Sequence, residues 1–187
     1  MLPVGELKRG TALILDNEPY VVTAFEFVKP GKGQAMYRTK LRNLVTGAVI
    51  EKTFRSGDSF EPAHLDQREA QYLYREGDSY TFMDNQTYEQ FAISEDILGD
   101  AKNYLIDNLP VEIVFFRDKP IGVQVPNFIN LRVVKCEPWT KGDTSGSDSK
   151  PATLETGFVL RVPPFINEGD LIQIDTRTGE YLSRVKE

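Results

Sequence analysis

The sequence predicts an all-β protein made of several small barrels. Short runs rich in β-branched and aromatic residues recur along the whole chain, and turn sequences built from Gly, Pro, Asn and Asp separate them. Many short strands joined by tight turns are typical of small barrels. One segment, residues 101–109, favours a helix, because Tyr104, Leu105 and Leu109 fall on one helical face and Asp100 is a suitable N-cap.

The first predicted module covers residues 1–64. Turns at residues 16–19, 46–47 and 56–58 punctuate its extended segments, and the predicted strands are residues 11–15, 20–28, 34–43 and 48–55. The second and third of these strands flank a glycine-rich run, so we expect them to form the two arms of a long hairpin.

Two later modules cover residues 65–127 and 128–187. In the second module the predicted strands are residues 69–74, 79–83, 88–93, 111–117 and 121–125. In the third they are residues 129–136, 154–162, 171–175 and 181–185, with a long polar loop over residues 137–153. Both modules suggest five-stranded barrels of the oligonucleotide-binding kind. Cores this small are expected to gain stability from packing between modules.

Composition and charge exclude several classes of protein. The net charge of −6 argues against a simple basic nucleic-acid binder, yet its distribution is uneven: +2 over residues 1–64, −7 over residues 65–128 and −1 over residues 129–187. The acidic middle either faces a basic protein partner or is a plain solvated surface. The chain has no apolar run near the ~20 residues of a membrane span, no signal-peptide core and a single cysteine, which together predict a cytoplasmic protein.

Conventional catalysis is not expected. The one histidine, His64, lies near the first predicted module boundary, and the one cysteine, Cys136, lies in an apolar strand where a buried structural thiol is typical. The chain has no Cys/His cluster with zinc spacing and no phosphate-binding GxxxxGK[ST] run. We therefore predict a protein that is not an enzyme and that holds no metal or cofactor.

The most informative feature is a lysine between two glycines at the predicted hairpin tip, in the run Lys29-Pro30-Gly31-Lys32-Gly33. Glycine permits positive φ and leaves no side chain to crowd the tip. Lys32 would then project alone, away from its own core, and is more useful to a partner than to the fold.

Three interpretations of this lysine remain open from the residues alone. In the first interpretation Lys32 belongs to a plain solvated turn. In the second it holds a cofactor on a swinging arm, as in a lipoyl or biotinyl domain, and in the third it is a cationic tip that enters an RNA-lined cavity. Basic residues make the hairpin and its root suitable for phosphate contact, which favours the third interpretation; they are Lys29, Lys32, Arg38, Lys40 and Arg42.

The chain resembles the bacterial elongation factor P family over nearly its full length. The residues that carry the resemblance are, in order, Lys29-Pro30-Gly31-Lys32-Gly33-Gln34-Ala35, Thr39-Lys40-Leu41, Thr46-Gly47, Glu51-Lys52-Thr53-Phe54, Tyr72-Leu73-Tyr74, Phe82-Met83-Asp84, Thr87-Tyr88-Glu89-Gln90, Lys141-Gly142-Asp143-Thr144, Lys150-Pro151-Ala152-Thr153-Leu154, Thr156-Gly157, Val162-Pro163, Asp175-Thr176-Arg177-Thr178-Gly179-Glu180-Tyr181 and Arg184. Their order and spacing together are specific, although each alone is weak.

This resemblance implies an SH3-like (KOW-like) N-terminal barrel and two OB-fold barrels, arranged in an L that mimics transfer RNA. It also implies a monomeric factor that binds the 70S ribosome, through rRNA and ribosomal proteins, between the peptidyl and exit sites and relieves stalling at consecutive prolines. Lys32 matches the family's tip residue, which contacts the peptidyl-tRNA and which a lysine-modifying enzyme extends in many bacteria. A protein that binds free single-stranded RNA remains the alternative.

The third module supplies two further candidate contacts with the ribosome. The resemblance places the loop Gly142-Asp143-Thr144 near the exit-site codon. Tyr181 and Arg184, three residues apart, would stack on RNA and pair with phosphate, unless Tyr181 belongs to the core. Trp139 and Pro164 depart from the family pattern, where glycine and an aliphatic residue are commoner.

Overall fold

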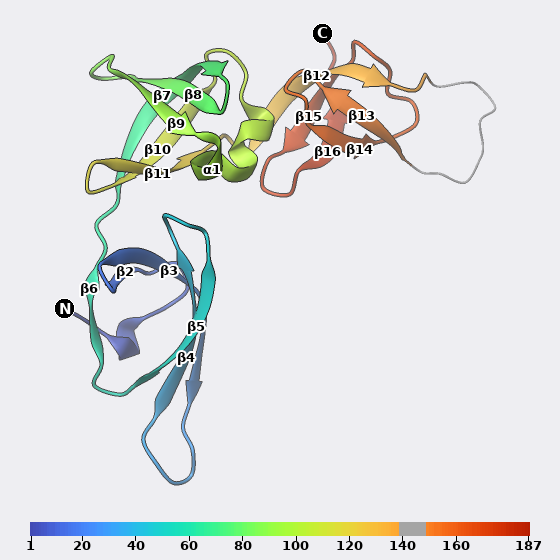
Figure 1. The fold of residues 1–187 in the computed structure, drawn as a ribbon. Helices are drawn as coiled ribbons and strands as arrows, with labels where there is room; N and C mark the ends of the chain where they lie inside the picture. The colour runs from blue at the N-terminus through green and yellow to red at the C-terminus, as the bar shows by residue number, and fades with distance from the viewer. Residues whose placement is uncertain (139–148) are drawn as a thin grey trace. The chain divides into compact units, whose positions relative to one another are not determined.

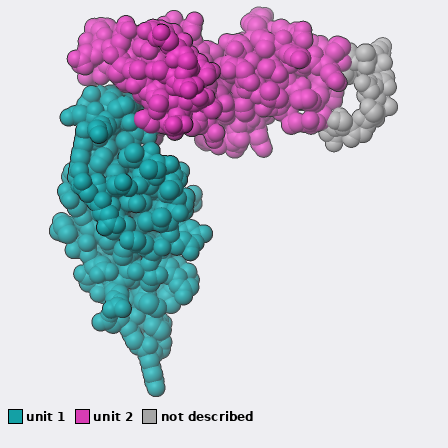
Figure 2. Space-filling view, in the orientation of Figure 1, with its two compact units in different colours: residues 1–68, 113–122 teal, residues 69–112, 123–187 magenta. Residues whose placement is uncertain are grey.

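A computed structural model describes residues 1–138 and 149–187 of the chain. Its contacts divide the chain into two compact units, the first with residues 1–68 and 113–122 and the second with residues 69–112 and 123–187 (Figure 2). Three antiparallel sheets account for nearly all the regular structure (Figure 1). The all-β prediction is confirmed.

The first sheet has six strands in the order β1-β6-β2-β3-β4-β5. Their bounds are β1 (Leu2–Pro3), β2 (Ala12–Leu15), β3 (Glu18–Val28), β4 (Met36–Asn43), β5 (Val49–Arg55) and β6 (Ser59–Pro62), and a 3₁₀ turn, η1 (Val4–Glu6), follows β1. Strands β1 and β6 are missing from the prediction, because β1 has only two residues and β6 (Ser-Phe-Glu-Pro) has one large apolar residue and a proline, which is typical of a turn.

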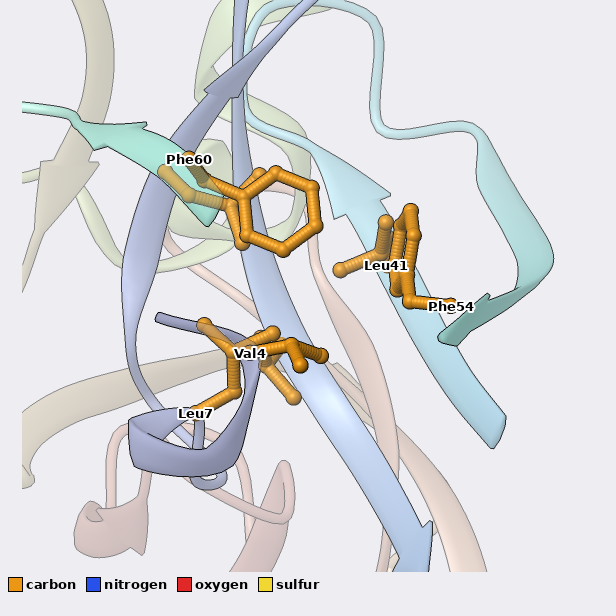
Figure 3. Packing of buried hydrophobic residues seen from close by; sticks show 7 residues of the cluster. Val4, Leu7, Leu41, Phe54 and Phe60 are labelled. Carbon is orange, nitrogen blue, oxygen red and sulfur yellow. The ribbon is translucent and has the colours of Figure 1, made fainter. Parts of the chain in front are cut away.

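The core of this sheet is a cluster of seven buried apolar side chains: Val4, Leu7, Leu13, Val22, Leu41, Phe54 and Phe60 (Figure 3). The rings of Phe54 and Phe60 meet edge to face with centroids 4.6 Å apart, an arrangement that aromatic pairs favour. Residues of β4 alternate strictly between this core and the outer face, so the core fixes which β4 side chains solvent and partners can reach.

The second sheet has the order β11-β10-β7-β8-β9 and the third has the order β14-β13-β12-β15-β16. Their strands are β7 (Asp66–Glu76), β8 (Ser79–Asp84), β9 (Gln90–Ser94), β10 (Pro110–Phe116), β11 (Lys119–Gln124), β12 (Phe128–Cys136), β13 (Lys150–Leu154), β14 (Val159–Val162), β15 (Leu171–Asp175) and β16 (Glu180–Arg184). The two end strands of the third sheet, β14 and β16, contact each other, which closes that sheet into a barrel.

Two predictions for these sheets were wrong in detail. The single strand expected over residues 154–162 is instead β13 and β14, joined by a turn in which Gly157 has φ +91° and donates its N–H to the Leu154 carbonyl. The apolar residues on both sides of that turn conceal it in the sequence. Strand β13 also begins at Lys150, inside the segment expected to be a loop.

The predicted helix over residues 101–109 was also wrong. Helical structure begins earlier, in α1 (Glu95–Leu98), and continues as a 3₁₀ helix, η2 (Gly99–Tyr104). Gly99, at φ +55°, interrupts the α-helical geometry, and the backbone is already extended at Leu105. The apolar residues that suggested a helical face are buried nonetheless.

One turn recurs at the end of a strand in each of the three sheets. Its five-residue sequences are Asn43-Leu44-Val45-Thr46-Gly47, Asp84-Asn85-Gln86-Thr87-Tyr88 and Asp175-Thr176-Arg177-Thr178-Gly179. The first residue is buried, and its side-chain Oδ1 accepts the N–H of the third residue at 2.7–2.9 Å. The N–H of the fifth residue, which has positive φ, donates to the carbonyl of the first at 2.8–2.9 Å.

The second and third sheets are joined within the second unit. The Tyr104 ring of η2 packs edge to face on Phe158, with centroids 5.6 Å apart, and the Thr156 hydroxyl donates to the Asn103 carbonyl at 2.6 Å. Tyr104 is almost fully buried, and this burial raises the pKa of its phenol. Packing between these two sheets therefore stabilises both, as expected for cores of this size.

Candidate functional site

The hairpin of β3 and β4 places the glycine-lysine run at its end. Register pairs run from Tyr20↔Asn43 to Val28↔Met36, with one bulge between Val22 and Ala24. The ladder stops at Val28↔Met36, so residues 29–35 form the loop. The hairpin extends beyond the other strands of its sheet (Figure 1), and the first unit narrows to a point at this loop (Figure 2).

At the tip, Gly33 has φ +124°, a backbone conformation that other residues rarely adopt. Gly31 does not need positive φ, so only one of the two glycines is required by the turn geometry. Lys32 is exposed, and within the described residues it makes no hydrogen bond and no ion pair. Lys29 is exposed as well, and Pro30 lies over Gly33, where an added Cβ would be 3.7 Å from the proline ring.

The basic residues of β4 share one face. Arg38, Lys40 and Arg42 are exposed because they alternate with buried residues of the same strand. Two acidic residues lie next to these basic residues. Glu26 lies across from Arg38 in the β3–β4 register, and Lys40 Nζ lies 3.4 Å from Glu51 Oε1. An exposed ion pair of this kind contributes at most about 1 kcal/mol, so a partner's phosphate can displace it.

A groove of ≈ 570 Å³ runs along this face, lined in part by Ala24, Glu26, Arg38, Lys40, Glu51 and Thr53. Small Ala24 leaves the groove open in the middle of β3. A second hollow of ≈ 450 Å³ lies in the second unit beside Glu69 and Glu112, and none of the predicted site residues lines it.

Tyr181 and Arg184 both lie on β16, in the second unit. Arg184 is exposed, and its guanidinium lies 5.6 Å from the Phe165 ring centroid and 4.0 Å from Asp170. Tyr181 is half-buried; burial raises the pKa of its phenol, and the nearby Arg184 charge opposes that rise. The predicted contacts Gly142, Asp143 and Thr144, and also Trp139, lie outside the described residues.

The two residues weighed for chemistry belong to different units of the chain. His64 is exposed between β6 and β7. Cys136 is half-buried rather than buried, and its thiol donates to the Ile166 carbonyl at 3.5 Å. Burial raises the pKa of this thiol, so little thiolate is present at neutral pH. Among the described residues, no group of three or more His, Cys, Asp or Glu side chains is placed to hold a metal ion.

The sequence reasoning missed one feature of the hairpin. An aromatic cluster lies on the face opposite the basic residues of β4 (Arg38, Lys40 and Arg42, the basic row), and its members are Phe25, Phe27 and Tyr37. Phe27 is 51% exposed. The signal was available, since Phe25 and Phe27 alternate along β3 on a single face.

Comparison with known proteins assigns the chain that carries this hairpin to a family. Three family models cover the chain in order: the elongation factor P (EF-P) KOW-like domain over residues 3–60, the elongation factor P (EF-P) OB domain over residues 65–123, and the elongation factor P C-terminal domain over residues 129–184. The chain belongs to the elongation factor P family. The chain is therefore a translation factor, and the predicted family and the predicted KOW-like and OB folds are confirmed.

Relatives in this family match the chain from end to end. Elongation factor P 2 of Geobacter sulfurreducens is 64% identical over 186 residues, and elongation factor P of Desulfatibacillum aliphaticivorans is 55% identical, each covering 100% of both chains. Among solved structures, translation initiation factor 5A from Methanococcus jannaschii matches with a TM-score of 0.53 and 26% identity, over 67% of this chain and 90% of that one.

None of the described helical segments is both long and apolar enough to cross a membrane.

Proposed function

We propose that this translation factor binds the 70S ribosome between the peptidyl and exit sites and promotes peptide-bond formation at consecutive prolines. The observation that carries the proposal is Lys32: an exposed cation without an internal partner among the described residues, at the end of a two-stranded arm. Such a side chain contributes little to its own fold, and its charge suits the phosphates and backbone oxygens of RNA.

The Lys32 tip acts by positioning rather than by reacting. Proline is a rigid secondary amine with fixed φ, so consecutive prolines hold the nascent chain away from attack geometry. A factor that restrains the peptidyl-tRNA brings the reacting atoms together more often. A tenfold gain in rate requires only about 1.4 kcal/mol, which a few charge-assisted hydrogen bonds to an oriented RNA end can supply.

Other basic and aromatic residues of the chain add further contacts with RNA in this proposal. Arg38, Lys40 and Arg42 contact RNA phosphates along the arm, while Tyr181 and Arg184 form a separate contact on β16. The loop Gly142-Asp143-Thr144 belongs to the same proposal. An unmodified lysine reaches roughly six ångströms beyond its Cα, so a covalent extension added by a lysine-modifying enzyme would deepen the contact.

The test is a reconstituted translation assay on a messenger that encodes three consecutive prolines, with Lys32→Ala as the variant. We expect rescue to be lost and folding to be unchanged. Lys119→Ala is the matched control, because Lys119 is another exposed lysine next to a hairpin turn. Undiminished rescue by Lys32→Ala would refute the proposal, and so would tight binding to naked single-stranded RNA with weak binding to ribosomes.

Intact-mass measurement of the protein from its native host addresses the state of Lys32. An added mass that maps to Lys32 and increases rescue supports an extended tip, whereas lipoate or biotin on Lys32 would contradict positioning and indicate a carrier.

A further inference from the structure

The aromatic cluster of the hairpin ends in a ring that is half open to solvent. Phe27 is the last but one residue of β3 and pairs in register with Tyr37, whose ring centroid lies 5.0 Å from its own at an interplanar angle of 54°. Tyr37 in turn contacts Phe25 at 5.5 Å, and both pack against the buried core. The Phe27 ring is thus held in place from the core side while 51% of the residue remains exposed.

Other exposed phenylalanines are covered differently. The Arg177 guanidinium lies 5.3 Å from the Phe128 ring centroid, and the Arg184 guanidinium lies 5.6 Å from that of Phe165. No described cation lies over Phe27, so its outer surface is open to a ligand.

The charge around this ring identifies the chemistry of the ligand. Residues 27–50 contain five Lys and Arg residues and no Asp or Glu. Arg38, Lys40 and Arg42 lie on the opposite face of the hairpin, so the cations near this ring are Lys29 and Lys32 of the tip loop. Lys29 and Lys32, within five residues of Phe27, are exposed and make no ion pair among the described residues. An open aromatic ring beside unpaired cations is the combination that binds single-stranded nucleic acid, because bases stack on the ring while cations neutralise the phosphates. A purely apolar partner would gain nothing from these charges.

We propose that Phe27, supported by Tyr37, is a stacking platform for an unpaired nucleobase of RNA. This inference rests on the proposed function, in which the factor restrains the peptidyl-tRNA. The RNA is then the acceptor end of that tRNA, which carries the nascent chain and whose last nucleotides are unpaired. Lys32 is five positions after Phe27 in the sequence, so their Cα atoms are at most about 18 Å apart. One short single strand therefore reaches both, and the stacked base fixes the strand that the lysine contacts.

The first test uses variants that separate the ring from its apolar volume. Phe27→Leu removes the aromatic face, and Phe27→Trp keeps one. We expect Phe27→Leu to raise the factor concentration for half-maximal polyproline rescue by about fivefold to 150-fold, the range that corresponds to losing one base–aromatic stack. Phe27→Trp should stay near the original value. Tyr74→Leu is the matched control, since Tyr74 is a strand aromatic of similar exposure (49%) in the other unit.

The second test observes the stack directly. A fluorescent base analogue is placed in turn at each unpaired position of the acceptor end of ribosome-bound peptidyl-tRNA, and the factor is added. Quenching at one position by the wild-type factor and by Phe27→Trp, but not by Phe27→Leu, supports the platform.

Absence of quenching at every position overturns the platform whatever the rescue assay shows. Rescue by Phe27→Leu equal to that of the wild type also overturns it, while leaving the role of Lys32 intact. Failure of the wild-type factor to rescue would instead count against the proposed function. Hydrogen exchange across β3 and β4 is measured in Phe27→Leu, because unchanged exchange shows that a loss of rescue is not a loss of folding. If exchange rises in Phe27→Leu, Phe27→Trp replaces it as the test: rescue and quenching near the wild-type values support the platform, and their loss overturns it.

Discussion

The turn that recurs in all three sheets permits a controlled measurement of how tightly the second and third sheets are packed. Gly47 and Gly179 are the fifth residues of two such turns, and both have φ +76°. A Cβ on Gly47 would meet nothing within 4 Å, whereas a Cβ on Gly179 would lie 3.3 Å from the hydroxyl oxygen of Tyr104. Alanine therefore introduces the same backbone cost at both sites and a steric cost at only one.

The expected magnitudes follow from these geometries. A side chain in the left-handed region costs about 1–2 kcal/mol, and alanine recovers about 0.4–1 kcal/mol by restricting the unfolded chain. Gly47→Ala should thus reduce local stability by about 1 kcal/mol. Tyr104 is 3% exposed and its ring is held against Phe158, so it has little room to move. Overpacking adds about 1–3 kcal/mol, which predicts a total loss of about 2–4 kcal/mol for Gly179→Ala.

The assay is native-state hydrogen exchange, because a chain with two compact units has no single unfolding free energy. Opening free energies are compared for the peptides that contain each turn. Tyr104→Phe removes the hydroxyl, so Gly179→Ala in that background should cost no more than Gly47→Ala. Equal losses for the two alanine variants would refute the claim that Tyr104 is held rigidly, and no loss for Gly47→Ala would refute the argument from positive φ.

Three further predictions concern the core, the pH dependence and the basic face. Leu41→Ala should lower the unfolding free energy of the first unit by about 2–5 kcal/mol in denaturant titration, because Leu41 is fully buried in its core; a loss below 1 kcal/mol would contradict the packing. Hydrogen bonding to Arg177 lowers the pKa of Asp175, so this carboxylate stabilises the third sheet above the ordinary aspartate pKa of about 3.9, and that contribution disappears as the pH falls through the lower folded-state pKa. Asp175→Asn should remove this acid dependence of exchange while keeping the turn, since asparagine fills the same role in the first sheet. Lys40→Ala should change stability by less than about 1 kcal/mol, since the Glu51 pair is exposed, yet weaken ribosome binding and flatten its salt dependence; an unchanged salt slope would exclude a phosphate contact at this position.

The sequence was a good guide to the two arms of the hairpin. Strands β3 and β4 were predicted within two residues at each end, because β-branched and aromatic residues recur along them and turn sequences limit them. Strand β6, with four residues, gave no such pattern. The helix was misplaced because burial of Tyr104, Leu105 and Leu109 follows from a 3₁₀ turn and an extended segment, which place the same residues inward without α-helical geometry.

The candidate site was predicted less evenly. The lysine tip could be recognised because glycines surround it, and the basic row because every second residue of β4 is charged. The pairing of Lys40 with Glu51 and the contact of Tyr37 with Phe27 depend on strand register, which residue patterns alone do not fix.

The state of the single thiol has a practical consequence. Cys136 is half-buried, bonded to a backbone carbonyl and mostly protonated at neutral pH, so alkylating reagents should modify it slowly. A second cysteine at exposed Gln34 would ionise as an ordinary thiol and react first. A fluorophore can therefore be attached beside the lysine tip without removing the native cysteine, and its emission would report the moment at which the arm leaves water for the surface of its partner.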